Sequence, residues 1–223
     1  MSITTTEQDA VLPIYKPRGM TSFGMVRTVR NQLNLRKVGH AGTLDPLAEG
    51  LLIILTGKKT KLMGEFLKMD KEYHATLQLG VESSSHDLET GVTERVKDLD
   101  LSLAQLEDAL KKFTGRIEQV PPAYSAKWLD GKRAYRLARQ NVGFELKPKL
   151  VTIEKIEIQS FNCPFVDLRV VCSSGTYIRS LARDIGTELG CGAVLAKLIR
   201  TRIGTYTVEA AIRLEDSRIG SAA

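Results

Sequence analysis

Leu51 to Leu55 is the longest uninterrupted aliphatic run in the chain, and it strongly restricts how the chain can fold. Five consecutive aliphatic residues are far too few to cross a bilayer, which takes about 20 residues in a helix. Because the run is short, contains two isoleucines and is closed by Gly57, it is typical of a strand buried on both faces. The sequence therefore predicts a sheet built around this strand, and no membrane span.

Periodic segments elsewhere predict further strands and helices. Alternating apolar residues predict strands over 11–15, 73–79, 151–161, 166–172 and 202–208. One helix is expected to begin at Thr21 or Ser22, with an apolar stripe of Phe23, Val26, Val29 and Leu33. A second is expected to begin at a capping box formed by Ser102 and Gln105. Two more are expected over 133–141 and 176–189. Strands and helices are interleaved without a regular βαβ rhythm. We therefore predict an α+β fold with a mixed, mainly antiparallel sheet flanked by helices.

The length of 223 residues suits one well-buried core. We predict a flexible N-terminal tail over 1–10, one catalytic domain over 11–215 and a C-terminal tail over 216–223. The first ten residues lack both a basic leader and an apolar core, so they do not predict a secretory signal. Residues 120–150 combine prolines, glycines, aromatic residues and many bases, and they predict a mobile insertion within the domain.

The few cysteines and histidines argue against a metal centre or a disulfide framework. The chain has 3 cysteines and 3 histidines. The cysteines form no C-x-x-C pair, and the histidines have no short ligand spacing. We therefore expect metal-independent chemistry without a cofactor, in the reducing cytoplasm.

Charge is distributed unevenly along the chain, whose formal net charge is +6. Residues 127–149 contain seven lysines and arginines against Asp130 and Glu145, whereas residues 82–108 contain eight acidic and two basic residues. Such clustering predicts a basic face that meets a polyanion. The alternative is that the bases only solvate exposed helix faces.

The segment Gly39 to Gly50 holds a single aspartate, Asp45, between glycine-rich turn chemistry and a proline. An aspartate on a tight, pre-set turn can present its oxygen at a fixed angle, which a nucleophile or a general base requires. An aspartate before a proline is also ordinary turn chemistry, which is the structural alternative.

The full string G-H-A-G-T-L-D-P-L-A-E-G resembles the catalytic signature of the TruB family of tRNA pseudouridine synthases. Three other segments are similar to that family in the same order along the chain: Lys16 to Ser22, Lys71 to Tyr73, and Ser174 to Arg179. The resemblance covers roughly residues 11 to 215, and it implies the pseudouridine-synthase fold.

The resemblance implies that Asp45 acts on a uridine flipped out of a folded RNA. Asp45 would attack the ribose C1′ or assist loss of the 2′ proton, and the released uracil would rejoin through C5. Both routes stay open. The resemblance also implies that Arg179 pairs with Asp45, and that Tyr73 stacks on the flipped uracil and helps to move the C5 proton. A buried aromatic and a surface arginine are the structural alternatives for these two residues.

The implied substrate is the TΨC stem-loop of tRNA, which is read by shape, backbone charge and flipped bases. His40 would insert beside the flipped nucleotide, with a turn-stabilising role as its alternative. Lys16 would brace the floor of the site, and Tyr177 would contact substrate. The insertion would close over the RNA, with these candidates for phosphate contact: Lys127, Lys132, Arg133, Arg136 and Arg139.

The match departs from the family at two places. The chain stops where a small C-terminal RNA-binding PUA module would begin, and Ser83 to Asp87 replace a T-D-T-x-D segment of which Asp87 remains. Three other functions stay open: an RNA chaperone that would not need Asp45, a carboxylate-dependent hydrolase, and the catalytic subunit of an RNA-guided complex. We expect a monomer.

Overall fold

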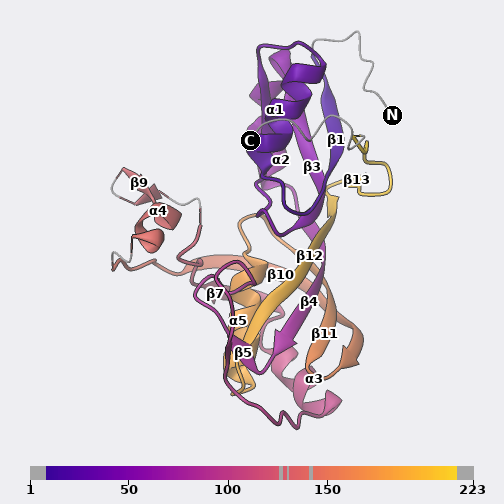
Figure 1. Ribbon diagram of the computed structural model, residues 1–223. Helices are drawn as coiled ribbons and strands as arrows, with labels where there is room; N and C mark the ends of the chain where they lie inside the picture. The colour runs from indigo at the N-terminus through magenta and orange to yellow at the C-terminus, as the bar shows by residue number, and fades with distance from the viewer. Residues whose placement is uncertain (1–8, 126–127, 130, 141–142, 215–223) are drawn as a thin grey trace. The chain divides into compact units, whose positions relative to one another are not determined.

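The computed structural model describes residues 9–125, 128–129, 131–140 and 143–214. The chain forms two compact units, of which the first contains 1–74 and 198–223 and the second contains 75–197. Strands β4 (Lys71–Leu79) and β12 (Ala193–Ile203) contribute residues to both units (Figure 1). The predicted domain boundaries stay a prediction.

The first unit is built around β3 (Glu49–Thr56), which contains the aliphatic run. β3 is antiparallel to β1 (Val11–Lys16) and to β2 (Val38–Ala41), and it is parallel to β12. A short strand, β13 (Tyr206–Thr207), turns back antiparallel onto β12. All residues from Leu51 to Leu55 are fully buried. The predicted two-sided burial of this strand is confirmed.

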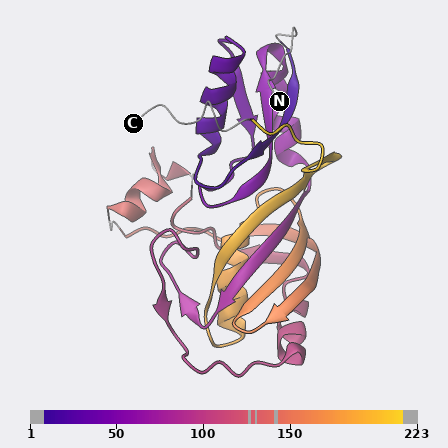
Figure 2. The ribbon, with the colours of Figure 1, turned by 45° about the vertical axis from the view of Figure 1, so that its right-hand side comes forward.

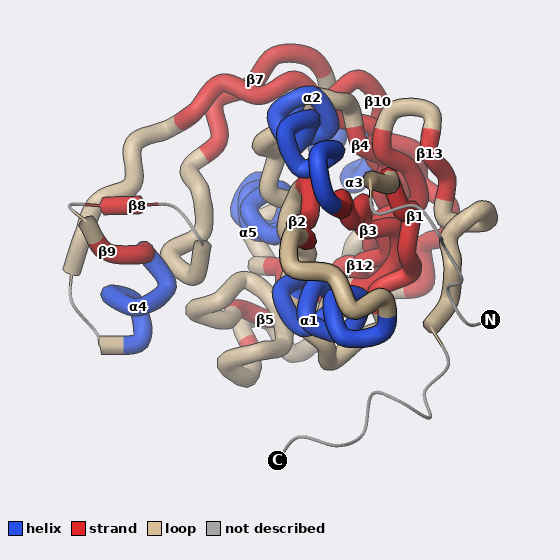
Figure 3. Tube along the Cα trace, turned by 90° about the horizontal axis from the view of Figure 1, so that it is seen from above, coloured by secondary structure: helices blue, strands red, loops and turns tan. Residues whose placement is uncertain are grey.

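Two helices cover the two faces of β3, and they lie on opposite sides of it in Figure 3. Leu52 and Ile54 pack in one apolar cluster with α1 (Ser22–Gln32). The alternate residues of β3 pack in a second cluster with α2 (Met63–Lys68), which follows the 3₁₀ helix η1 (Gly57–Leu62). Because successive side chains of a strand point to opposite faces, one unbroken aliphatic run serves both clusters.

Helix α1 begins where the sequence predicts, but one residue of its predicted stripe is wrong. The side chain of Thr21 accepts a hydrogen bond from the Gly24 amide at 2.9 Å and caps the helix. Phe23, however, is 62% exposed, whereas Met25 is completely buried. Met25, Val26 and Val29 follow the three- and four-residue spacing of one helix face, and Phe23 falls outside it.

The second unit contains a sheet with the strand order β12–β4–β11–β10–β7 (Figure 2). Its long strands are β10 (Lys149–Asn162) and β11 (Phe165–Cys172), and β7 (Gly115–Gln119) is shorter. Strand β10 is antiparallel to both of its neighbours, β11 and β7. Two small hairpins are separate from this sheet. They are β5 (Val81–Glu82) with β6 (Thr93–Glu94), and β8 (Trp128–Leu129) with β9 (Lys132–Arg133).

The helices of the second unit agree with the local sequence signals. Helix α3 (Leu103–Lys111) begins with the predicted capping box, in which Ser102 and Gln105 each bond the other's backbone. Helix α5 (Ile178–Glu188) buries Ile178, Leu181 and Ile185, as its periodicity predicts. The short α4 (Ala134–Arg139) lies inside the predicted insertion. No helix in the described part of the chain is long and apolar enough to cross a membrane.

The α+β class and the mixed, mainly antiparallel sheet are confirmed, but the predicted strand over 202–208 is wrong in extent. Residues 193–203 form the long strand β12, and the chain then turns at Gly204 into β13. Alanine, leucine, lysine and arginine in this segment all favour helices. Pairing with β3 overrides that local preference.

Candidate active site

The candidate nucleophile Asp45 lies in the first unit, on a loop over 42–48 that joins β2 to β3. The Ala48 amide donates to the Asp45 carbonyl at 3.1 Å, which closes a turn across Pro46. Proline presets the backbone angle that the second position of such a turn requires. The Asp45 residue is half-buried. The sequence predicted a loop from Gly39 to Gly50, but Gly39 to Ala41 belong to β2, because they pair with β3.

Ser22 fixes the residue directly before Asp45. The Leu44 amide donates to the Ser22 Oγ at 2.8 Å, and that hydroxyl donates to the Leu44 carbonyl at 3.0 Å. Ser22 is buried at the start of α1. Since both backbone groups of Leu44 are satisfied by one buried side chain, the loop cannot shift at Asp45 without losing two hydrogen bonds.

Lys16 holds the other side of the same turn. Its Nζ donates to the carbonyls of Met20 at 2.7 Å, Pro17 at 2.9 Å and Pro46 at 3.4 Å. Lys16 is completely buried, and this burial lowers its pKa to about 8, although the negative charges of Asp45 and Glu49 oppose the shift. The predicted bracing role of Lys16 is consistent with these contacts.

Tyr73 contributes to the first unit from β4, where it is 8% exposed and neighbouring His74 is exposed. This agrees with the predicted alternation of the strand. The Tyr73 side chain hydrogen-bonds with Arg200, a residue of β12 that the sequence analysis did not select. Arg200 also interacts electrostatically with Asp45. The available signal was a charged residue two places after Leu198, on the same inward face of a strand.

His40 lies on β2 opposite Ile54 rather than in a turn. It is half-buried, and within the described residues its Nδ1 atom has no hydrogen-bond partner. Burial lowers the pKa of His40, and the positive charge of Arg200 lowers it further. A neutral imidazole is therefore favoured, which suits stacking on a base better than contact with a phosphate.

Arg179 and Tyr177 lie in the second unit, at the start of α5. Arg179 is buried and donates to the carbonyls of Ser85 at 3.0 Å and Tyr124 at 2.9 Å. Its Nε lies 3.7 Å from a carboxylate oxygen of Asp87. Both backbone groups of Tyr177 bond the side-chain amide of Gln119. The predicted roles of Arg179 and Tyr177 in the reaction stay predictions.

Asp87 accepts hydrogen bonds and forms an ion pair at the place where the sequence departs from the family's T-D-T-x-D pattern. Its carboxylate accepts from the Ser85 hydroxyl at 2.5 Å and from the Glu89 amide at 3.0 Å. The Ser85 hydroxyl supplies the group that a threonine would supply. The retained aspartate is buried and forms the ion pair with Arg179.

The predicted phosphate contacts fall on the insertion. Arg136 is exposed on α4. The backbones of Lys132 and Arg133 form β9, and that of Arg139 ends α4. Lys127 lies outside the described residues.

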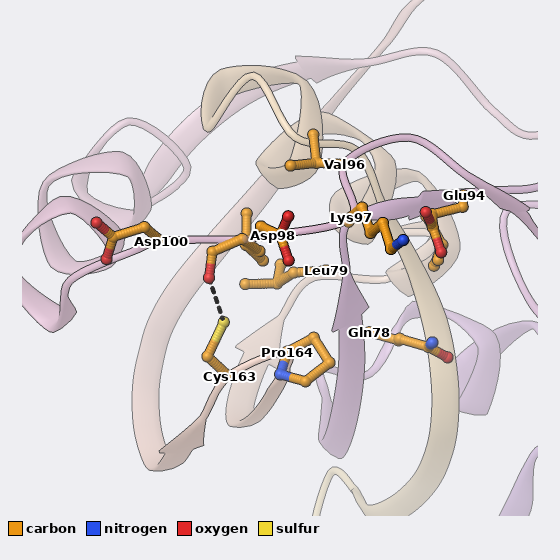
Figure 4. A pocket seen from close by; sticks show the side chains of 12 residues that line it. Gln78, Leu79, Glu94, Val96, Lys97, Asp98, Asp100, Cys163 and Pro164 are labelled. Atoms are coloured by element: carbon orange, nitrogen blue, oxygen red, sulfur yellow. Dashed lines mark hydrogen bonds between the residues drawn. The ribbon is translucent and has the colours of Figure 1, made fainter.

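A surface pocket of about 570 Å³ in the second unit is separate from these candidates (Figure 4). Charged side chains of both signs line it, among them Glu94, Lys97 and Asp98, and the Cys163 Sγ lies 3.6 Å from the Leu99 carbonyl. None of the predicted site residues lines this pocket. Among the described residues, no group of histidine, cysteine, aspartate and glutamate is arranged to hold a metal ion.

Comparison with protein families gives two adjoining matches. Residues 30–178 match the N-terminal domain of TruB family pseudouridylate synthases. Residues 179–218 match the C-terminal domain of tRNA pseudouridylate synthase B. Together these matches contain Asp45, Tyr73, Arg179 and Arg200.

Whole proteins and solved structures agree with the family match. The tRNA pseudouridine synthase B of Phocaeicola vulgatus is 48% identical over 94% of this chain and 92% of that protein. The same enzyme of Protochlamydia amoebophila is 45% identical over 94% of this chain and 79% of that protein. A crystal structure of a Cbf5-Nop10-Gar1 complex matches with a TM-score of 0.74 and 32% identity, over 95% of this chain and 54% of that chain.

A second solved structure, an H/ACA RNP bound to a substrate RNA containing 2′-deoxyuridine, matches with a TM-score of 0.70 and 29% identity. This chain spans about half the length of both matched chains. One conclusion follows from the turn that carries Asp45, the buried cations beside it, the family matches and the long alignments with synthase B enzymes. The chain belongs to the TruB family of pseudouridine synthases.

Proposed function

We propose that this protein converts uridine 55 to pseudouridine in the TΨC stem-loop of tRNA, with Asp45 as the nucleophile. The observation that carries the proposal is the half-buried aspartate on a turn fixed by Ser22 and Lys16. The identity of 48% to a tRNA pseudouridine synthase B over nearly the whole chain supports tRNA as the substrate.

The reaction is an isomerisation in which atoms are neither gained nor lost overall. The bond between N1 and C1′ breaks, a bond between C5 and C1′ forms, the C5 proton leaves, and N1 takes up a proton. A carboxylate at C1′ or at the 2′ proton can promote the first step. Two buried cationic side chains, Lys16 and Arg200, interact electrostatically with Asp45 and favour its ionised form.

The remaining candidates have separate tasks in this proposal. Tyr73 stacks on the flipped uracil and assists removal of the C5 proton, and neutral His40 fills the space that the base leaves in the RNA. Arg179 assists the reaction as a cation, and Tyr177 contacts substrate. Phosphate groups of the stem-loop meet the basic insertion, where Arg136 is exposed.

We also propose that the protein acts as a monomer in the cytoplasm. The compartment is supported by the state of the cysteines, because Cys163, Cys172 and Cys191 are all free. Free thiols are typical of a reducing compartment.

The test is incubation of the protein with an unmodified tRNA transcript, followed by mapping of pseudouridine at single-nucleotide resolution. We expect conversion at uridine 55 and at no other uridine. A transcript with cytidine at that position is the matched control and should gain no pseudouridine. Conversion at another position would contradict the proposed specificity, and no conversion at any position would contradict the function.

A further inference from the structure

Arg200 is a buried charged residue of β12 in the first unit. It is 2% exposed and ranks among the largest fully buried side chains of the described residues. Its Nε donates to the Leu51 carbonyl at 2.8 Å, and its Nη2 donates to the Gly42 carbonyl at 3.0 Å. Leu51 begins the aliphatic run of β3, and Gly42 begins the loop that carries Asp45. One planar guanidinium therefore ties the first residue of the loop to strand β3.

The backbone is built to bring Arg200 to this place. Arg200 pairs with Gly50 in the parallel register of β12 and β3. Gly50 has a φ of +105°, and a Cβ atom there would lie 2.4 Å from the Arg200 carbonyl oxygen. Glycine thus allows an approach of the two strands that any side chain would block. At Gly42, a Cβ atom would lie 3.5 Å from the Arg200 Nη1, so the guanidinium also lies directly against the loop.

The charge of Arg200 acts on the groups of the reaction. The side chain hydrogen-bonds with Tyr73 and interacts electrostatically with Asp45 and with His40. In the first unit, Lys16 on β1 interacts electrostatically with Asp45, with Glu49 on β3 and with Arg200. Burial lowers the pKa of Arg200, but a guanidinium in a protein keeps its charge.

We propose that Arg200 is a positioning residue for the isomerisation: it fixes the Asp45 loop through Gly42 and supplies the positive charge that keeps Asp45 ionised beside Tyr73. The proposal rests on the proposed function of Asp45. It adds a residue that does not touch the substrate and acts through the carboxylate and the phenol.

The test compares Arg200→Gln, which removes the charge but keeps two N–H donors, with Arg200→Lys, which keeps the charge but loses the planar fork. For Arg200→Gln we expect kcat to fall roughly 100-fold with KM within about twofold of wild type. The acidic limb of the pH–rate profile should move to higher pH, because Asp45 loses a compensating positive charge. For Arg200→Lys we expect a smaller loss of kcat and an acidic limb near that of wild type.

Arg202 provides a matched control on the same strand. It is partly buried and pairs with Glu72 at 3.7 Å. Arg202→Gln should leave both the acidic limb and kcat within about twofold of wild type. If Arg202→Gln shifts the acidic limb as much as Arg200→Gln does, the assignment to Arg200 is wrong. Loss of folding in both Arg200 variants would show a purely structural role and would also overturn the proposal.

A measurement without RNA separates this proposal from the proposed function. Titration of the Asp45 carboxyl carbon by NMR in the free protein should give a higher pKa in Arg200→Gln than in wild type and in Arg200→Lys. An unchanged carboxyl pKa would overturn the role of Arg200 even if wild type modifies tRNA. A raised carboxyl pKa would support it even if the true RNA substrate differs.

Discussion

His86 is a half-buried ionisable residue in an unusual backbone conformation. Its φ of +61° is in the left-handed region, and within the described residues its Nδ1 atom has no hydrogen-bond partner. Burial, followed by the positive charges of Arg183 and Arg179, lowers the pKa of His86 to about 4, and Asp87 opposes the shift. The imidazole is therefore neutral at pH 7, beside the arginine that the site is predicted to use.

A pH-dependent loss of stability follows from this lowered pKa. The unfolded chain takes up a proton at His86 near pH 6.5, whereas the folded chain resists until about pH 4. The contribution of neutral His86 to the free energy of unfolding is therefore complete above pH 6.5. It is lost as pH falls toward 4, by up to roughly 3 kcal/mol. His86→Asn should remove this part of the loss, because asparagine does not take up a proton in this pH range. Asparagine also tolerates the left-handed backbone. The free energy of unfolding, measured with a denaturant from pH 7.5 to 4.5, checks this prediction. If wild type and His86→Asn lose the same stability in acid, the assignment to His86 is contradicted.

At the scale of elements, the close approach of β3 and β12 at Gly50 is the most demanding feature of the first unit. Gly50→Ala would place its new methyl group against the Arg200 carbonyl in a backbone conformation that alanine rarely adopts. We expect a loss of about 2 kcal/mol or more in the free energy of unfolding, and a loss of activity as Arg200 is displaced.

Gly64 provides the control for that prediction. It lies in α2, where a Cβ atom would meet open space. Gly64→Ala should stabilise the protein by about 0.5 to 1 kcal/mol, because alanine favours the helix. Denaturant unfolding of both variants checks the pair. A Gly50→Ala protein as stable as wild type would show that β12 does not approach β3 as described.

At the scale of the whole molecule, net positive charge is expected to drive the encounter with tRNA. Arg136→Glu, on the exposed surface of α4, should raise KM without changing kcat, and the slope of log KM against log salt should fall by about one. Lys97→Glu, an exposed lysine in the acidic segment 82–108, is the matched control and should leave KM unchanged. Equal effects of the two substitutions would show that the insertion makes no specific phosphate contact.

Local signals explain which parts of the fold were predictable from the sequence. The aliphatic run predicted β3 because two-sided burial leaves no alternation, and the Ser102–Gln105 box predicted the start of α3 because a cap needs only neighbouring residues. Most of strand β12 was not predicted, since its residues favour helix and its partner β3 is distant in sequence.

The candidate site also contains one part that local sequence predicts and another that it does not. The Asp45 turn is a local pattern of glycine, aspartate and proline, so its sequence was informative. Arg200 was missed because the carbonyls that it binds lie 149 and 158 residues away along the chain. An arginine at an inward strand position is a weak sign by itself, and only the fold reveals its partners.

The central claim is that the Asp45 carboxylate performs the isomerisation, and single-turnover kinetics with Asp45→Asn test it most directly. Asparagine keeps the size of the side chain and its place on the turn but removes the nucleophilic charge. We predict that this variant binds the tRNA transcript within about threefold of the wild-type affinity and loses at least roughly 10⁴-fold in rate. Pseudouridine formed at uridine 55 at near the wild-type rate by Asp45→Asn would contradict the account.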